Sequence, residues 1–166
     1  MTRFVEVSHT EWIAAPVSKV RAQFADLRHH IAANVHPKLS FEVLSETDQS
    51  ARFVQFVRLL GIKQRDVFER RFLADGTMID TSVEGFNKGG SLTFHFTPVA
   101  RQGRDGTDVA VTIRLPVPPL MGFLSGLLES QVRRELLAAV AEDKHDLEVR
   151  GYPMSAARRD AQRVAA

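Results

Sequence analysis

The sequence predicts an α+β fold, in which a curved seven-stranded antiparallel sheet wraps around a long C-terminal helix and two short helices follow the first strand. Three observations carry this prediction. Segments that alternate apolar and polar residues, typical of half-buried strands, follow one another with short turns between them. A proline and an apolar stripe of helical spacing come after the first such segment. Near the C-terminus, apolar residues recur every four positions over about 30 residues, which predicts a long helix packed on the sheet.

The N-terminal region predicts one strand and two short helices. Residues 4–13 alternate apolar and polar side chains, as expected of a strand. Pro16 suits the first position of a helix, where the missing N–H costs nothing. Apolar residues three and four apart then predict a helix over residues 17–29, and residues 31–35 predict a second one. Pro37 ends this region, because the residue before a proline avoids the helical conformation.

The middle of the chain predicts an antiparallel meander. Turn sequences rich in Gly, Asn, Asp and Ser separate alternating segments, and such short connections favour pairing of neighbouring strands. The expected strands are 39–47, 51–60, 62–74, 77–86, 91–100 and 107–115.

The last element is predicted to be a long amphipathic helix. Two prolines, Pro118 and Pro119, precede it, and Gly151 and Pro153 mark its end. Its apolar stripe repeats every four residues through Leu120, Leu124, Leu128, Val132, Leu136 and Val140.

This order of elements, together with four local signals, resembles a known superfamily. The signals are residues 11–16 (EWIAAP) leading into the first helix, His36-Pro37, the strands punctuated by glycines, and the long final helix. They are similar to the SRPBCC superfamily of START domains, pollen-allergen-type proteins and polyketide cyclases, over residues 3–152. The chain departs from that pattern at Arg21, where many members carry Trp. The resemblance implies a single helix-grip domain over residues 1–153. The small, polar and net basic residues 154–166 predict a flexible basic tail.

The resemblance also implies a deep, mostly apolar cavity between the sheet and the final helix. In the superfamily such cavities hold lipids, sterols, quinones or aromatic polyketides, and a minority of members are enzymes. Strand alternation predicts inward apolar faces, for example Phe94 with Phe96 and Val109 with Val111. We predict these ligand-binding residues: Phe41, Gln64, Asp66, Phe68, Arg70, Val83, Phe94, Phe96, Val111, Phe123 and Leu127.

Three polar residues on one face of segment 62–74 are unusual. Gln64, Asp66 and Arg70 share that face with Phe68 and Phe72, and an unpaired buried charge is very costly. Asp66 and Arg70 lie roughly 13 Å apart along the strand, too far to pair with each other. Either the three orient a ligand, or a shifted register returns them to solvent, or cross-strand partners satisfy them. The last two alternatives are favoured.

The leading functional prediction is the binding of a small hydrophobic ligand, namely a lipid, a quinone or an aromatic, polyketide-like molecule. One alternative is an enzyme of the polyketide aromatase/cyclase type, with Asp66 as general acid–base and Arg70 holding an enolate or carboxylate. Another is a protein-interaction or quinone-chaperone module, with a small cavity and an exposed apolar patch at residues 120–128.

Several kinds of chemistry are not expected. The absence of cysteine excludes disulfides, thiolate metal sites and a cysteine nucleophile. No GxSxG, P-loop or GxGxxG motif occurs, and no cofactor is predicted. His29, His30 and His36 raise the question of a metal, but adjacent histidines on a helix point about 100° apart and no HExxH spacing occurs. We therefore expect no metal site.

The charge distribution argues against nucleic acid as a partner. The net charge of +2 is carried by the tail, in which three arginines oppose Asp160, and the rest of the chain has no basic stripe. The N-terminus lacks a secretory signal pattern, and the uncharged stretch 115–128 is shorter than the roughly 20 residues that span a bilayer. The sequence thus predicts a cytoplasmic protein without an integral membrane segment and with homodimerisation as a possibility.

Overall fold

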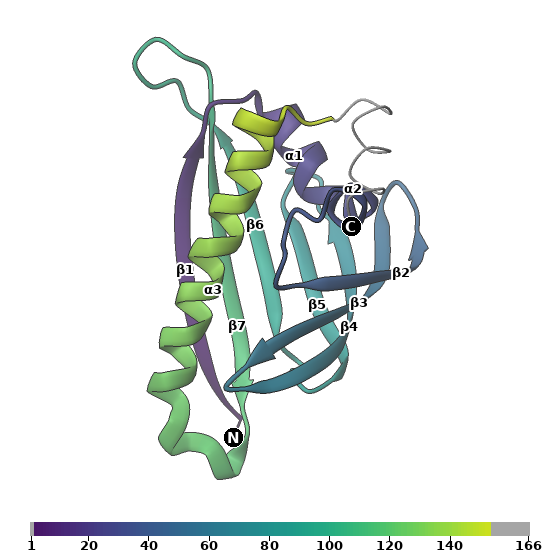
Figure 1. Ribbon diagram of the computed structural model, residues 1–166, viewed down its shortest axis with the longest axis vertical. Coiled ribbons are helices and arrows are strands. Elements are labelled where there is room, and N and C mark those ends of the chain that lie inside the picture. Colours follow the sequence, from purple (N-terminus) through teal and green to yellow (C-terminus); the bar gives the residue numbers. More distant parts are fainter. Residues whose placement is uncertain (1, 154–166) are drawn as a thin grey trace.

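The computed structural model describes residues 2–153 and has the predicted architecture (Figure 1). The elements, in chain order, are β1 (Arg3–Ile13), α1 (Val17–Ala25), α2 (Leu27–Ala33), β2 (Ser40–Glu46), β3 (Ser50–Leu59), β4 (Ile62–Phe72), β5 (Met78–Gly85), β6 (Ser91–Pro98), β7 (Thr107–Val117), a 3₁₀ helix (Pro119–Leu124), α3 (Ser125–His145) and a final π-helical turn (Asp146–Arg150). The predicted flexible tail, 154–166, lies outside the described residues.

The seven strands form one antiparallel sheet in the order β1-β7-β6-β5-β4-β3-β2. Strands adjacent in the sequence pair with each other from β2 to β7, and β1 joins the far edge by pairing with β7. Short turns make this meander possible because antiparallel neighbours need no crossover. The sheet twists and curves, so that α3 runs beside β1 and β7 while β2, β3 and β4 cross at an angle (Figure 1). The helix-grip prediction is confirmed.

The apolar stripe of α3 faces the concave side of the sheet. The buried residues of the stripe are Leu128, Val132, Leu136 and Val140, as the four-residue spacing predicts. They pack in one core cluster with inward residues of β1 and β7 such as Val7 and Val109. Burying an aliphatic side chain of this kind contributes about 1.5–3 kcal/mol, so the helix is stabilised by the sheet rather than by its own propensity.

None of the helices among residues 2–153 has the length and apolar character needed to cross a lipid bilayer.

Candidate functional site

A cavity of about 160 Å³ lies between the concave face of the sheet and α3. Most of its lining is apolar and comes from every strand between β2 and β7 as well as from the three helices, with Phe24, Phe53, Phe68, Leu92, Val111 and Leu136 among the contributors. Besides Lys38, Gln55 and Glu135, the polar lining contains two groups. The sheet cluster consists of Asp66, Arg70, Asp80 and Asn87, and the helix cluster of His30, His36, Glu142 and Asp143.

The structure brings six of the predicted binding residues to this cavity. They are Phe41, Asp66, Phe68, Arg70, Phe94 and Val111. Gln64 lies deeper, beside a separate small hollow, and its side-chain oxygen accepts a hydrogen bond from Asn87 Nδ2 at 2.8 Å. Phe96 is buried in the core against Phe24, with ring centroids 5.6 Å apart, and does not reach the cavity.

Three further predicted residues lie outside the cavity. Val83 alternates on β5 with the buried Asp80 and Ser82, and therefore faces the opposite side of the sheet. Phe123 is 83% exposed and Leu127 is 58% exposed. The chain enters α3 through a 3₁₀ helix, and both residues lie off the stripe that faces the sheet. The expectation that Val83, Phe96, Phe123 and Leu127 line the cavity is thus wrong.

Arg70 is paired across the sheet with Asp80 on β5. The pair is bidentate, since Nε and one terminal nitrogen of Arg70 each donate to a different carboxylate oxygen of Asp80 at 2.7 Å. The other terminal nitrogen donates to the carbonyl oxygens of Phe24 and Ala25 at the end of α1, at 3.2 Å each. Four of the five N–H groups of Arg70 are therefore engaged within the protein. Of the alternatives left open by the sequence, the structure shows cross-strand pairing.

Asp66 on β4 is held by neutral donors. One carboxylate oxygen accepts the backbone N–H of Asn87 at 2.6 Å and the Ser82 hydroxyl at 3.3 Å, and the other accepts Asn87 Nδ2 at 2.8 Å. Asn87 lies in the turn that follows β5. The sheet cluster thus ties β4, β5 and this turn together while it still lines the cavity.

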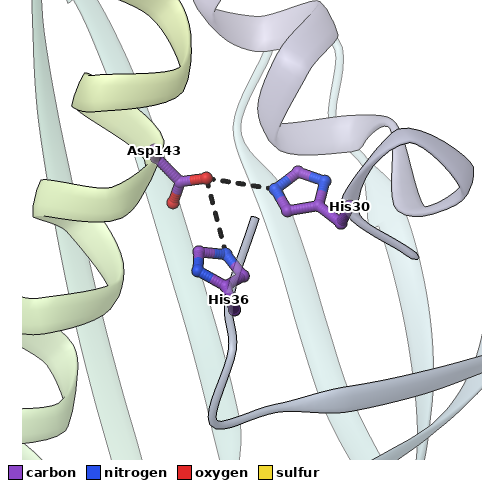
Figure 2. Close-up of side chains that lie close together, drawn as sticks. All are labelled: His30, His36 and Asp143. Carbon is purple, nitrogen blue, oxygen red and sulfur yellow. Dashed lines mark hydrogen bonds and ion pairs between the residues drawn. The ribbon is translucent and has the colours of Figure 1, made fainter. Parts of the chain in front are cut away.

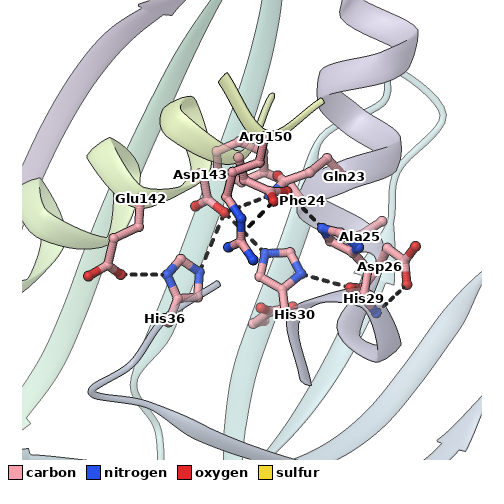
Figure 3. A network of polar contacts seen from close by, with 12 residues as sticks. Gln23, Phe24, Ala25, Asp26, His29, His30, His36, Glu142, Asp143 and Arg150 are labelled. Atoms are coloured by element: carbon pink, nitrogen blue, oxygen red, sulfur yellow. Dashed lines mark hydrogen bonds and ion pairs between the residues drawn. The ribbon is translucent and has the colours of Figure 1, made fainter. Parts of the chain in front are cut away.

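Helix caps position the histidines of the helix cluster. Asp26 caps α2, and its side chain accepts the backbone N–H of His29 at 2.8 Å. The helix ends at Asn34, which adopts a left-handed conformation (φ 47°), and the chain then turns back toward α3 through His36. Both ends of this short helix are fixed, so His30 and His36 face α3 from two different backbone segments (Figure 3).

The histidines meet three acidic residues near the C-terminal end of the long helix. His29 Nε2 lies 2.7 Å from Asp146, His30 Nε2 lies 3.0 Å from Asp143, and His36 Nδ1 lies 2.8 Å from Glu142. His29 and His30 thus diverge to different carboxylates, as their adjacent positions on a helix predict. Gln23 on α1 joins the two buried aspartates by donating to both.

The acidic partners were missed from the sequence, although a signal for Asp143 exists. It lies three residues after Val140 and seven after Leu136, in line with the buried stripe of α3. A charged residue in that stripe must be paired, and histidines on a neighbouring segment are natural partners.

Burial and charge act against each other on His36 and Asp146. Burial alone would lower the pKa of His36, but the Asp143 and Glu142 carboxylates favour the imidazolium and raise it above its ordinary value. Burial alone would raise the pKa of Asp146, but hydrogen bonds from His29 and Gln23 and the charges of His29 and Arg150 lower it overall.

The lowered pKa of Asp146 predicts an acid-dependent loss of stability. A carboxylate with a depressed folded-state pKa stabilises the protein above its unfolded pKa of about 3.9, and the contribution is lost as the pH falls through the folded pKa. We expect Asp146→Asn to lower the free energy of unfolding at pH 6 by about 1–3 kcal/mol. The difference between variant and wild type should shrink as the pH falls to 3, measured by urea unfolding. A difference that stays constant over this range would contradict the assignment.

Among residues 2–153, one group of His, Asp or Glu side chains has donor atoms close enough together to hold a metal ion. It consists of His30, His36 and Asp143. Each of them is buried and lines the cavity.

Comparisons with known proteins show similarity of structure. No family model matches the sequence, and no curated protein does. Among solved structures, a protein from Thermus thermophilus is 19% identical with a TM-score of 0.69 and matches 84% of this chain and 94% of its own. A START superfamily protein from Mycobacterium smegmatis is 15% identical with a TM-score of 0.69 (86% and 98% covered). The Zhui aromatase/cyclase from Streptomyces sp. R1128 is 18% identical with a TM-score of 0.60 (90% and 99% covered). The chain therefore has the helix-grip fold of START superfamily proteins and aromatase/cyclases.

Proposed function

We propose that the protein binds a small hydrophobic molecule in the cavity between the sheet and α3. The observation that carries this proposal is the cavity itself, with apolar walls and two polar clusters that would orient a ligand. Removing apolar surface from water contributes about 25 cal/mol per Å², so the walls supply affinity and the polar groups supply orientation. The likeness to a START superfamily structure and to an aromatase/cyclase supports the same class of ligand.

The size and lining of the cavity favour an aromatic, polyketide-like or quinone-like ligand over a long acyl chain. Its volume of about 160 Å³ is close to that of an engineered apolar cavity of about 150 Å³ that binds benzene. Phe53 and Phe68, whose rings stack with centroids 5.6 Å apart, form part of the wall. A larger ligand would have to extend past Lys38 and Glu135, which also line the cavity and form an ion pair in which the Lys38 side chain is exposed.

The contacts of Asp66 and Arg70 favour binding over catalysis by these two residues. A general acid–base must reach a substrate proton, yet both Asp66 oxygens already accept hydrogen bonds from Asn87 and Ser82. Arg70 likewise donates four hydrogen bonds within the protein, to Asp80 and to the carbonyl oxygens of Phe24 and Ala25. The aromatase/cyclase alternative rests on the shared fold, and fold alone does not establish a reaction.

The experiment that tests the proposal is native mass spectrometry of the freshly purified full-length protein, followed by denaturing extraction. We expect an added mass that leaves on denaturation and is identified as a lipid, a quinone or an aromatic compound. The control is the same protein unfolded and refolded before the measurement, which should give the bare mass and then recover the added mass when the extract is returned. No recovery from the extract would contradict specific binding in the cavity.

The prediction of a protein-interaction module remains a prediction, as does that of a homodimer. Leu120 and Phe123 are strongly exposed at the start of the final helical region, as that alternative expects of an apolar patch.

A further inference from the structure

We infer that His30, His36 and Asp143 bind a divalent first-row transition-metal ion at the wall of the ligand cavity. Figure 2 shows the three side chains converging from α2, from the segment that follows it, and from α3. Asp143 Oδ1 lies 3.0 Å from His30 Nε2 and 3.4 Å from His36 Nε2. The three donor atoms all lie within 4.8 Å of one another.

The two separations from Asp143 suit coordination of a single ion. Imidazole nitrogens and carboxylate oxygens bind zinc at about 2.0–2.2 Å. Two such donors at tetrahedral or octahedral angles are roughly 2.9–3.5 Å apart by simple trigonometry on those bond lengths. The distances from Asp143 to both histidines fall in that interval. Two imidazoles with one carboxylate is also a set that suits zinc, iron(II) and neighbouring divalent metals.

The outer nitrogen of each imidazole is already fixed by an oxygen acceptor. His30 Nδ1 lies 2.7 Å from the backbone carbonyl oxygen of Asp26, and His36 Nδ1 lies 2.8 Å from a Glu142 carboxylate oxygen. A carbonyl oxygen can only accept, so His30 Nδ1 carries a proton and donates it. The same donation from His36 to Glu142 leaves both Nε2 atoms pointing at Asp143. Metal-binding histidines almost always have this arrangement, in which the outer N–H is held by a carbonyl or carboxylate.

Positive charge, from protons or from a metal ion, must lie between the Nε2 atoms and Asp143. Neutral imidazoles with protonated Nδ1 would direct Nε2 lone pairs at a carboxylate oxygen, and this contact is repulsive unless positive charge intervenes. The charge is either a proton on each ring or a shared metal ion. Asp143 is buried and the Glu142 carboxylate lies 2.8 Å from His36, so the helix cluster contains two carboxylates whose negative charge a divalent ion would balance.

The three side chains would fill only part of the coordination sphere of a metal ion. Three protein donors leave one or more coordination positions open, as in catalytic rather than structural zinc sites. His30, His36 and Asp143 all line the cavity, so an ion held by them would lie at the cavity wall, next to the space proposed for the ligand. An oxygen atom of a bound molecule could complete the coordination. The metal site itself does not depend on the proposed ligand, because its donors belong to the chain.

The test is metal binding by the full-length protein, purified without a polyhistidine tag and treated with a chelator. We expect isothermal titration with Zn²⁺ to give one site per chain with a Kd below about 1 μM. Co²⁺ should give the visible d–d absorption of a low-symmetry site, and Zn²⁺ should abolish it. A saturating concentration of Zn²⁺ should also raise the midpoint of thermal unfolding, because a metal that binds the folded state stabilises it.

Variants localise the site. His36→Ala should weaken Zn²⁺ binding at least ~100-fold. Glu142→Gln removes the carboxylate charge behind His36 and leaves a neutral amide oxygen as the acceptor, and it should weaken Zn²⁺ binding about 10–100-fold. His145→Ala is the matched control, because His145 is an exposed histidine on α3 outside the cluster. Circular dichroism establishes that each variant is folded; should His36→Ala fail this check, the folded Glu142→Gln variant decides. The inference is overturned if the wild type binds Zn²⁺ no more tightly than His36→Ala or Glu142→Gln and gives no Co²⁺ spectrum. The histidines and Asp143 would then be joined by hydrogen bonds alone.

Discussion

Asp80→Asn is expected to lower the free energy of unfolding by about 3–5 kcal/mol, because it leaves the guanidinium of Arg70 buried without its counter-charge. Both side chains are almost fully buried, and the pair is bidentate with two contacts of 2.7 Å. Removing one partner of such a pair costs far more than the pair itself contributes. The measurement is equilibrium unfolding in urea at neutral pH.

Two comparisons separate this effect from a general loss of charge. Glu69→Gln removes the partner of Arg52 in an exposed cross-strand pair on the adjoining strands β3 and β4, and should cost less than about 1 kcal/mol. The double variant Arg70→Met/Asp80→Leu replaces the buried pair by apolar groups and should be more stable than Asp80→Asn alone. If Asp80→Asn and Glu69→Gln had equal effects, Arg70 would not depend on Asp80 as its contacts indicate.

The alternation of apolar and polar residues was sufficient to predict the sheet. Each strand was located to within about three residues of its observed bounds, because the meander has short turns and one solvated face. The inward face of β3 could not be chosen from its own residues. It is decided by pairing with β4, where Phe53 lies opposite Phe68 and Gln55 opposite Asp66. Since residues directly opposite share a face, the face of β4 determines that of β3.

The error at Val83 has a physical cause in the sheet cluster. β5 directs Asp80 and Ser82 inward, where they bind Arg70 and Asp66 of β4, so its apolar Ile79 and Val83 face outward. If the apolar residues of such a strand are assumed to face inward, its inward and outward faces are assigned the wrong way round. Polar residues inside are recognised only when their partners on the neighbouring strand are known.

The contacts between the histidines near α2 and the acidic residues near the end of α3 could not be predicted from the sequence either. The three histidines are close together in the sequence, but their acidic partners lie more than 100 residues further along the chain. Their proximity follows from the packing of α3 between β1 and the segment that contains α2, which local patterns do not determine. The long helix was predicted, but the 3₁₀ helix at its start, in which Phe123 is exposed, was not.

The second large effect is expected from filling the cavity. Ala139 lines it from α3, so Ala139→Trp should place an indole in the space proposed for the ligand. We expect binding of the aromatic probe 1-anilinonaphthalene-8-sulfonate, followed by its fluorescence, to weaken at least tenfold, which corresponds to about 1.4 kcal/mol. A larger side chain in a packed region also costs stability, typically 1–3 kcal/mol, so the unfolding curve is measured with it.

A matched control distinguishes blocked binding from an altered helix. Ala141 lies two residues further along α3 and is exposed, so Ala141→Trp adds the same indole to the same helix outside the cavity. It should bind the probe as the wild type does. Probe bound at the exposed apolar residues Leu120 and Phe123 would be insensitive to both substitutions, because they leave that surface unchanged. Equal binding by all three proteins would therefore move the site out of the cavity, whereas a loss confined to Ala139→Trp would place it between the sheet and α3.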